Sequence, residues 1–543
     1  MSADVAFQHA CSQVLEAVGA RLISGPSITS NDFECHIDVG TFDAPWHLLV
    51  KGRWPFVRLP NVYLTDPTQA ANMAHVNYEG DVCYSDREGE GFSPAEADAP
   101  FVLANAVMRS WETLEASAAM RDRGNFNDLL DEFEGFWNSL PSCRTVLMES
   151  DPQSGAQLYA RIRKNKGDFT LHGIDTGSSI ESGVERVRLK VLTLQTPLLP
   201  PTPGAPWEKD WLDELFSRGE QQGLGVRMPG IHILLCRQRR PSGGESFFGV
   251  SYTGVISASK EFTVKHLRPF GVSRCWREHL LRRVGGENIT RRIAVVGCGS
   301  LGSRVAEQLA LSGIDEMVLV DPERFSSDNI YRHVLGRDCV GAYKVDKLAE
   351  EIQKKRPGMT VTPRHEDALR WLSTSGQRQA CYALVLATGN LALEREIFRR
   401  CYAETWSQRV ISGWIEPLGL GGHTISSRYG ERGCLECLHR ESGETRPVPK
   451  TQFLTPGQKF SENLTGCGGA FTPYAASAAI QTALIMTEIV LSDTQGYRFW
   501  IGPDDQVSKK DMTTTHWYKE CVAEKRDGRG LDISEEHCPC CGT

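Results

Sequence analysis

Apolar residues form a strand, helix, strand pattern near the middle of the chain. Residues 293–296 are a short apolar run of the kind that parallel sheets bury on both faces. Apolar positions then recur at helical spacing over 303–311, and a second apolar run at 317–320 ends at Asp321. Three glycines lie between the first run and the predicted helix: Gly297, Gly299 and Gly302.

This order is typical of a nucleotide-binding turn. The glycines let the backbone approach a phosphate, and the N-terminus of the helix stabilises its negative charge. The acid about 20 residues further on accepts a hydrogen bond from a ribose hydroxyl. A glycine pattern alone also occurs in structural turns, but the two strands and Asp321 favour a nucleotide site.

The hydrophobic pattern predicts an α/β protein of three domains, at 1–145, 146–285 and 286–543. The first has a helix over 7–22, alternating strands over 33–39 and 46–50, and two amphipathic helices near 100–116 and 126–140. The second has strand-like segments around a proline-rich connector at 198–206. It has no group of residues typical of a catalytic or metal site, so we expect a spacer or docking domain of mixed helices and strands. The third holds the nucleotide site.

Composition narrows the class of protein. Of 543 residues, 40% are hydrophobic and 24% charged, and the net charge is −8, which does not favour non-specific nucleic-acid binding. The longest apolar stretch, 475–491, contains Gln481 and Glu488, which indicates a buried helix and no membrane span. Seventeen cysteines without a signal peptide predict a reducing, cytoplasmic location, with thiols as core residues, metal ligands or nucleophiles.

A polar cluster follows Asp321 and changes the expected nucleotide. Arg332 offers a planar fork of donors and Lys344 a point charge, and both suit phosphate oxygens, while Asn329 adds a neutral hydrogen bond. A dehydrogenase needs no such cluster, whereas an enzyme that forms an adenylate must hold a triphosphate. We therefore expect ATP and not a nicotinamide cofactor.

These motifs closely resemble the MoeB/ThiF and ubiquitin-activating adenylation family. The family's glycine motif matches Gly297, Gly299 and Gly302, and its strand-terminal Asp matches Asp321. Its Asn-x-x-Arg motif matches Asn329 and Arg332, and its Gly-x-x-Lys-Val-Asp motif matches Gly341, Lys344 and Asp346. The resemblance implies a Rossmann-like fold, ATP with Mg²⁺, and adenylation of a small protein's C-terminal glycine.

One position departs from that family. The family usually has Thr-Asp-Asn after the next strand, and its aspartate helps to hold magnesium, but this chain has Gly389 between Thr388 and Asn390. Either phosphates and water hold most of the magnesium, or Asp321 or Glu416 substitutes. Asn390 remains a predicted nucleotide-binding residue.

Two Cys-x-x-Cys pairs predict a structural zinc site. The four thiolates needed for a closed tetrahedral site come from Cys434, Cys437, Cys538 and Cys541, with Cys540 as a surplus cysteine. Between the pairs, Cys467 lies in a glycine-rich loop before a long predicted helix. In the family the thiol that takes the acyl group from AMP lies there, so Cys467 is the candidate activating cysteine; a loop required only for tight packing is the alternative.

The N-terminal domain contains a second candidate nucleophile, Cys83, after a Gly-Asp turn. A buried core thiol is the ordinary interpretation of a cysteine, but a polar loop and Asn77 nearby favour a nucleophile with an amide for the oxyanion. Pro55-Phe56, Pro60, 75–77 and 80–83 resemble the ubiquitin-conjugating fold, with Val76 where that family has proline. The resemblance implies an α+β domain with Cys83 as the catalytic cysteine.

Together the domains resemble bacterial fusions of ubiquitin-like conjugation found in anti-phage defence operons of the CBASS type. That resemblance implies a thioester relay from Cys467 to Cys83 and then to a target amine. It also implies a ubiquitin-like protein or a CD-NTase C-terminus as substrate. It implies a homodimer as well, in which an arginine reaches the neighbouring nucleotide; the candidates are Arg274, Arg277, Arg282 and Arg283. A sulfur-carrier-protein adenylyltransferase and a non-catalytic ATP-binding scaffold are the alternatives.

Overall fold

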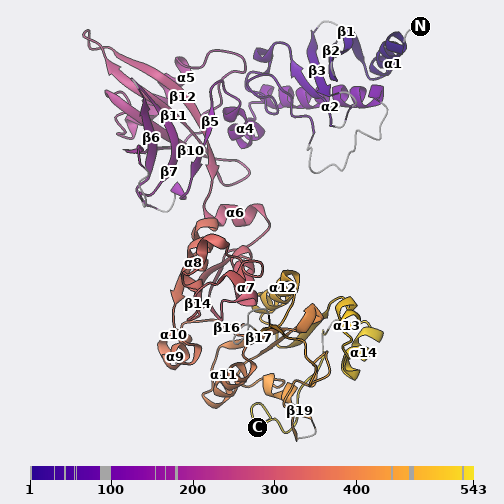
Figure 1. Cartoon of the computed structure of the whole chain (residues 1–543). Coiled ribbons are helices and arrows are strands. Elements are labelled where there is room, and N and C mark those ends of the chain that lie inside the picture. The colour runs from indigo at the N-terminus through magenta and orange to yellow at the C-terminus, as the bar shows by residue number, and fades with distance from the viewer. Residues whose placement is uncertain are drawn as a thin grey trace. The chain divides into compact units, whose positions relative to one another are not determined.

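The chain folds into two compact units, Met1–Cys275 and Trp276–Thr543. The computed structural model (Figure 1) describes residues 3–29, 31–41, 44–53, 56, 58–85, 99–152, 155–165, 167–177, 182–441, 444–463, 470–526, 528 and 531–542. Cys467 and Pro55, two residues singled out from the sequence, lie outside this part of the chain. The unit boundary lies ten residues before the predicted start of the nucleotide domain at 286.

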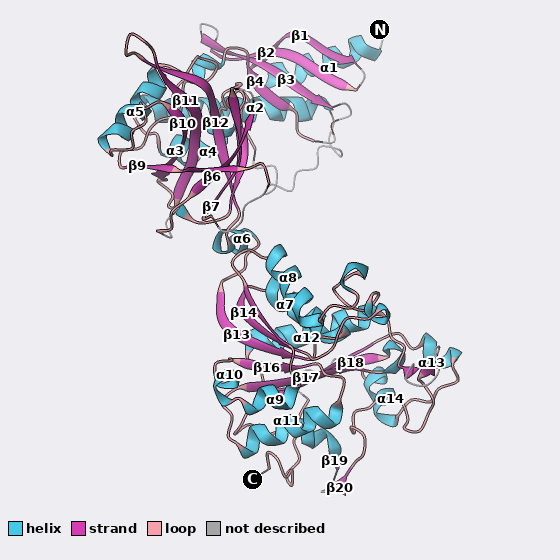
Figure 2. Cartoon of the chain, turned by 60° about the vertical axis from the view of Figure 1, so that its left-hand side comes forward, coloured by secondary structure: helices cyan, strands magenta, loops and turns pink. Residues whose placement is uncertain are grey.

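The first half of the N-terminal unit is an antiparallel sheet covered by a long helix. After α1 (Ala3–Ala17), the strands β1 (Ala20–Thr29), β2 (Asp32–Thr41), β3 (Ala44–Arg53) and β4 (Asn61–Leu64) follow in order. A short 3₁₀ turn, η1 (Pro67–Ala70), precedes the Cys83 loop. Alternate residues of β2 are buried, as a strand with one covered face requires. Helix α2 (Ala99–Asp122) shares this core (Figure 2).

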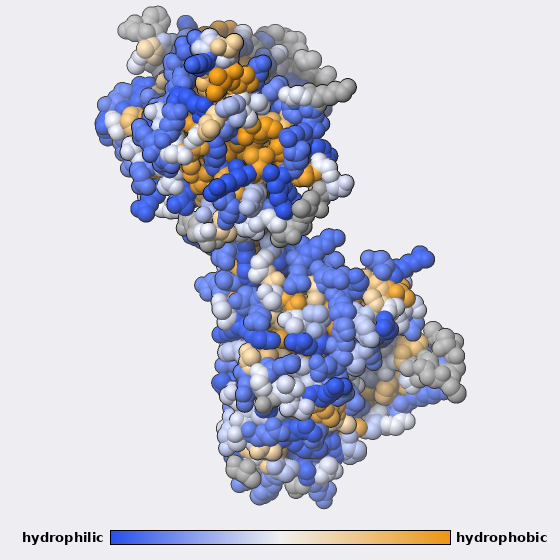
Figure 3. All heavy atoms as spheres, turned by 90° about the vertical axis from the view of Figure 1, so that its left-hand side faces the viewer, coloured by the Kyte–Doolittle hydropathy of each residue, from blue (hydrophilic) through white to orange (hydrophobic). Residues whose placement is uncertain are grey.

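The second half of this unit is an eight-stranded sheet in the order β8-β6-β7-β5-β12-β11-β10-β9. The strands are β5 (Arg144–Met148), β6 (Tyr159–Asn165), β7 (Asp168–Asp175), β8 (Glu185–Arg188), β9 (Lys190–Leu194), β10 (Gly230–Arg239), β11 (Glu245–Ile256) and β12 (Phe262–Arg274). Apolar residues gather on the face of this unit that Figure 3 presents. Helix α5 (Asp210–Gln221) packs on the sheet through Leu215 and Phe216.

The helix predicted over 126–140 differs from the observed structure. It consists of two short helices, α3 (Asn127–Asp131) and α4 (Phe133–Asn138). The buried side chains of α4 belong to the core of the eight-stranded sheet and not to the core of the N-terminal sheet. The aromatic side chains of α4 explain this position, because Phe133 and Trp137 lie against Phe248 of β11 with ring centroids 4.3 and 5.0 Å apart.

The C-terminal unit is built on a seven-stranded sheet in the order β15-β14-β13-β16-β17-β18-β23. Strands β13 (Ile289–Val296), β14 (Ile314–Val320), β15 (Thr360–Arg364), β16 (Ala383–Leu386) and β17 (Arg409–Ile415) are parallel. Strand β18 (Gly421–Ser427) is antiparallel to β17, and β23 (Gly496–Ile501) is antiparallel to β18. Helices α7 (Ser300–Leu311), α8 (Lys344–Lys355) and α12 (Ala476–Ser492) share one core, while α9 (Ala368–Ser373) and α11 (Leu391–Ala403) belong to the other.

The apolar run of β13 is explained by these two cores. Ile293 and Val295 belong to one core, and Ala294 and Val296 to the other, so every residue of the run is buried. The predicted strand, helix, strand order is confirmed, although α7 begins at Ser300, three residues before the predicted start. Among the described residues, no helix is sufficiently long and apolar to cross a bilayer.

Short elements complete the C-terminal unit. They are α6 (Arg277–Arg283), η4 (Ser327–Asn329), η5 (Arg337–Cys339), α10 (Ser375–Gln379), η6 (Pro417–Gly419), η7 (Leu435–His439), β19 (Arg440–Glu441), β20 (Glu444–Thr445), β21 (Glu462–Asn463), β22 (Ala470–Phe471), α13 (Asp505–Lys509) and α14 (His516–Ala523).

Candidate functional site

The predicted nucleotide residues meet at one edge of the C-terminal sheet. Strand β13 lies between β14 and β16, and all three are parallel, so their carboxyl ends share this edge. The chain leaves β13 toward β14 and β15 and returns to β16 on the other side. Ligands of open α/β sheets bind at such a reversal of strand order.

The glycine turn is closely packed against the end of β16. Gly297 has φ +87°, and a Cβ there would lie 2.7 Å from the Cα of Thr388. A Cβ on Gly302 would lie 1.8 Å from the carbonyl oxygen of Gly297, so α7 touches the turn. At Gly299, the N-cap residue of α7, a Cβ would meet nothing within 4 Å. The turn therefore packs tightly at two glycines and leaves room for a ligand at the third.

Asp321 is buried behind this turn. Its carboxylate accepts hydrogen bonds from the backbone N–H of Cys298 at 2.7 Å and of Glu323 at 2.8 Å. The pKa of Asp321 is raised, because the effect of burial exceeds the opposite effect of the two backbone hydrogen bonds and of the Lys344 charge. The carboxylate thus fixes the glycine turn, and its predicted bond to a ribose hydroxyl stays a prediction.

Lys344 begins α8 with its ammonium group buried in an ion pair with Glu323. The Glu323 side chain is 69% exposed, so it can leave without a desolvation cost and release Lys344 to a phosphate. The sequence interpretation did not include Glu323. Its position, two residues after Asp321 at the end of the strand, could have indicated that its carboxylate lies near the nucleotide site.

The segment that carries Arg332 is tied to the glycine turn by His333. The backbone N–H of Leu335 donates to His333 Nδ1 at 3.0 Å, so Nε2 carries the proton and donates to the carbonyl of Cys298 at 2.8 Å. Burial lowers the pKa of His333 to about 4, which keeps the ring neutral. His333 is a second residue that the sequence interpretation did not assign a role.

Arg332 and Asn329 make different contacts in this segment. The carbonyl of Arg332 accepts from Ser300 Oγ at 3.1 Å, and its guanidinium lies 5.6 Å from the ring centroid of Tyr474. The amide oxygen of Asn329 accepts from the backbone N–H of Ser326 at 3.1 Å, which caps η4. Asn329 therefore shapes the loop, and a direct contact with a nucleotide remains a prediction.

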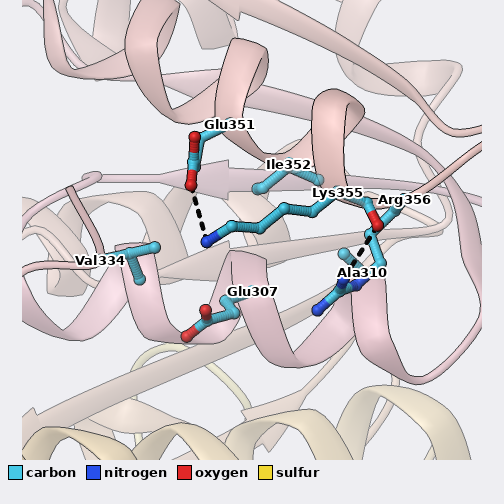
Figure 4. Close-up of a pocket in the computed structure, with 7 residues that line it drawn as sticks. All are labelled: Glu307, Ala310, Val334, Glu351, Ile352, Lys355 and Arg356. Carbon is cyan, nitrogen blue, oxygen red and sulfur yellow. Dashed lines mark hydrogen bonds and ion pairs between the residues drawn. The ribbon is translucent and has the colours of Figure 1, made fainter.

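The small cleft between α7 and α8 beside this segment has its charges paired internally. Figure 4 shows the Lys355 side chain between the carboxylates of Glu351 and Glu307, and its ammonium pairs with Glu351 at 2.7 Å. Glu307 pairs in turn with Arg304 at 3.3 Å. Arg356, which also lines the cleft, donates to the carbonyl of Lys355 at 2.9 Å.

At the end of β16, the expected magnesium ligand is absent. Gly389 has φ +68°, and a Cβ there would meet nothing within 4 Å. Asn390 caps α11 by accepting from the Leu393 N–H at 3.1 Å. Glu416, at the end of β17, is buried; one oxygen lies 2.9 Å from His423 Nε2, and the other has no hydrogen-bond partner among the described residues. The residues present do not fit the family's usual magnesium arrangement, so the ligands named from the sequence remain proposals.

Cys83 is exposed at the end of a hairpin-like loop in the N-terminal unit. Val76 pairs with Val82, and the Asn77 amide oxygen accepts from the N–H groups of Glu79 and Asp81, each at 3.0 Å. Asn77 therefore positions the loop through its oxygen. A contribution of its amide N–H to an oxyanion is not tested by this arrangement.

The four predicted zinc ligands do come together. The sulfur atoms of Cys434, Cys437, Cys538 and Cys541 all lie within 4.8 Å of one another, and all four residues are buried. Cys434 Sγ is 3.7 Å from Cys538 Sγ, and Cys437 Sγ is 3.4 Å from Cys541 Sγ. Tetrahedral zinc with bonds of about 2.3 Å separates its sulfurs by about 3.8 Å, so this set fits the ion. The Cys540 thiol lies instead near the carbonyl of Phe398, 3.7 Å away.

The four arginines proposed to reach a nucleotide differ in their environment. Arg274 is the last residue of β12, whereas Arg277, Arg282 and Arg283 belong to α6. Arg274 pairs with Glu134 of α4, and buried Arg277 donates to the carbonyl of Gly313. Arg282 and Arg283 are exposed in the last turn of α6. Of the four, these two remain available in this structure.

Comparisons with known proteins identify two families in the chain. Residues 285–502 match the ThiF family, and residues 16–145 match prokaryotic E2 family B. The "ATP-dependent ubiquitin transferase-like protein Cap2" of Vibrio cholerae is 21% identical over 514 residues, 83% of this chain and 86% of that protein.

Two further relatives align over shorter regions. The Pseudomonas aeruginosa protein of the same name is 26% identical over 38% of this chain and 36% of its own length. The "Molybdopterin-synthase adenylyltransferase" of Salmonella typhimurium is 31% identical over 28% of this chain and 60% of its own length. The chain thus spans about a third to three fifths of these two relatives. Both family assignments made from the motifs are confirmed.

Proposed function

We propose that this chain, which joins a ThiF-family region to a prokaryotic E2 family B region, uses ATP to activate a protein C-terminus and transfers it to a target amine. The observation that carries this proposal is that one chain contains both a glycine turn at a sheet edge with Lys344 and Arg332 and an exposed Cys83 in the region that matches the E2 family. A ThiF-family nucleotide site alone does not require the second feature.

The first step is adenylation. A carboxylate oxygen of the substrate attacks the α-phosphorus of ATP, an O–P bond forms, and pyrophosphate leaves with the electron pair of the broken bond. Lys344, once released from Glu323, and Arg332 stabilise the charge that develops on the phosphate oxygens. Gly299 and the N-terminus of α7 hold the adjoining phosphate.

The next steps transfer the acyl group between thiols. Cys467 takes it from the adenylate, forming a C–S bond as AMP leaves, and Cys83 then takes it from Cys467 by thioester exchange. A target amine, most simply a lysine, finally displaces the Cys83 thiolate. Exposure of Cys83 supports its place as the last carrier, because the acceptor is a protein surface.

The substrate is proposed to be a ubiquitin-like protein or the C-terminus of a CD-NTase in an anti-phage system of the CBASS type. The Cap2 relatives, whose printed names describe ubiquitin transferase-like proteins, support this class. We also propose cytoplasmic action and a homodimer of the C-terminal unit. Ile480 and Leu484, one turn apart on α12, are exposed apolar side chains that suit a partner copy.

A non-reducing gel tests the relay. The protein is incubated with ATP and a purified partner that ends in glycine. We expect thiol-sensitive adducts; Cys83→Ala retains only the Cys467 adduct, and Cys467→Ala abolishes both. Cys143→Ala, which removes a half-buried thiol of the same unit, serves as the matched control. An adduct that persists equally in both nucleophile variants would exclude the two-cysteine relay.

A sulfur-carrier-protein adenylyltransferase is the second candidate. The 31% identity to a molybdopterin-synthase adenylyltransferase favours it, whereas the E2 family B region argues against it. A non-catalytic ATP-binding scaffold is the third, and Gly389 is the observation in its favour. Pyrophosphate exchange that depends on a partner's C-terminal glycine separates the scaffold from both enzymes.

A further inference from the structure

A carboxylate and a histidine form a closely held pair beside the Cys83 loop. Glu132, between α3 and α4, places one oxygen 2.7 Å from His75 Nδ1 and accepts the backbone N–H of His75 at 2.9 Å with the other. His75 has φ +62°, a conformation uncommon for residues other than glycine, and this double contact holds it there. The pair comes from segments 57 residues apart in sequence.

His75 lies directly opposite Cys83 in the loop. The backbone N–H of Cys83 donates to the carbonyl of His75 at 2.8 Å, next to the antiparallel pairing of Val76 with Val82. This hydrogen bond joins the two backbones directly, so the imidazole and the thiol start from adjacent positions, within the range of an electrostatic interaction.

The surroundings favour a protonated ring. The hydrogen bond to Glu132 raises the pKa of His75, with further contributions from the charges of Glu132 and Asp128; burial opposes it. On the thiol side, Asp81 is two residues before Cys83 and disfavours a negative sulfur. A cation at His75 offsets that repulsion.

We propose that His75, held by Glu132, is a positioning residue whose imidazolium stabilises the Cys83 thiolate. The inference rests on the proposed function, because it assigns Cys83 as the acyl carrier. The thiol proton goes to solvent and the thiolate attacks the carbonyl carbon of the incoming thioester. A C–S bond forms, the bond to the donor sulfur breaks, and the donor sulfur leaves as a thiolate. His75 keeps its proton throughout, and its neighbouring charge makes the thiolate available at neutral pH.

Alkylation of the full-length protein by iodoacetamide tests the charge effect without ATP or a partner. The rate at Cys83 is followed by peptide mass spectrometry from pH 5 to 10. We expect His75→Asn, in a residue type that tolerates the left-handed conformation, to raise the midpoint pH by about one unit and to slow alkylation at pH 7 by about tenfold. Glu132→Gln, which keeps an acceptor for the His75 N–H, shifts the midpoint in the same direction by less.

His47→Asn is the matched control. His47 also pairs with a carboxylate, Asp38, at 2.6 Å, but it lies on β3 and is not opposed to Cys83. Circular dichroism verifies that each variant is folded. An unchanged midpoint in both His75→Asn and Glu132→Gln would overturn the proposal, as would an equal shift in His47→Asn. If the midpoint shifts but no ATP-dependent adduct forms, the proposed function fails while the charge effect on Cys83 stands.

Discussion

Gly389 is the residue at which the predicted nucleotide site departs from the pattern of the MoeB/ThiF family. Its φ of +68° and the empty space around a Cβ mean that an aspartate fits there at a small backbone cost. We predict that Gly389→Asp lowers the Mg²⁺ concentration needed for half-maximal pyrophosphate exchange several-fold, because it adds an oxygen ligand. Gly389→Asn, with the same size and no charge, is the control, and an equal effect of both variants would contradict a role in magnesium binding.

His333 makes the stability of the C-terminal unit depend on pH. The folded state keeps the ring neutral because its pKa is about 4, whereas histidines in an unfolded chain take up a proton near pH 6.5. Between these values the unfolded state binds more protons, so stability falls as the pH falls. We expect a loss of about 2 kcal/mol between pH 7 and pH 5. Urea unfolding at the two pH values should show a smaller loss in His333→Gln, while His516→Gln at an exposed histidine should match wild type.

The residue types at the nucleotide site followed from the sequence, but several of their contacts did not. Gly297 and Gly302 are required by close packing, since a side chain at either would overlap the backbone; their predicted contact with a phosphate stays a prediction. Asn329 and Asn390, in contrast, use their side chains to cap η4 and α11. Glu323 and His333 were missed because an ion pair and a buried ring depend on how distant segments pack, which spacing does not encode.

At the scale of elements, the strands and helices with a strong apolar pattern in the sequence were predicted well. The β13 run stands out, because burial on both faces leaves a continuous apolar signal. Helix α12 matches the predicted apolar stretch to within one residue at each end, although Ile480 and Leu484 on its outer face are exposed. The segment 126–140 was misjudged, because its aromatic residues fit a helix on either sheet. Their partner, Phe248 on β11, is more than 100 residues away in sequence, and only the folded chain selects it.

Helix α4 gives a test of that packing. Trp137 is fully buried, and its indole N–H donates to the carbonyl of Phe270 at 3.0 Å. We predict that Trp137→Phe costs about 1–3 kcal/mol, because it removes this hydrogen bond and part of the packing. Calorimetry should show an earlier transition for the N-terminal unit. Trp500→Phe removes a comparable bond to Thr482 at 2.9 Å, so its effect should be confined to the C-terminal unit.

At the scale of the whole molecule, the zinc ligands join the C-terminal tail to the body of one unit and leave the other unit untouched. Cys434 is the N-cap of η7 and Cys437 lies within it, while Cys538 and Cys541 come from the tail, and all four residues belong to the unit Trp276–Thr543. Bound zinc favours only the folded state of that unit, so its removal lowers the stability of that unit alone.

Cys541→Ser and Cys540→Ala separate the zinc site from ordinary packing of the tail. Both thiols are buried in the same turn, but only Cys541 belongs to the four-sulfur cluster, while Cys540 contacts the Phe398 carbonyl. We expect one zinc per chain in wild type and in Cys540→Ala by elemental mass spectrometry, and less than one in Cys541→Ser. The Cys541→Ser transition should move to lower temperature for the C-terminal unit only. Equal zinc content in all three proteins would mean that the thiols serve as core residues, since losing one of four ligands must weaken a closed tetrahedral site.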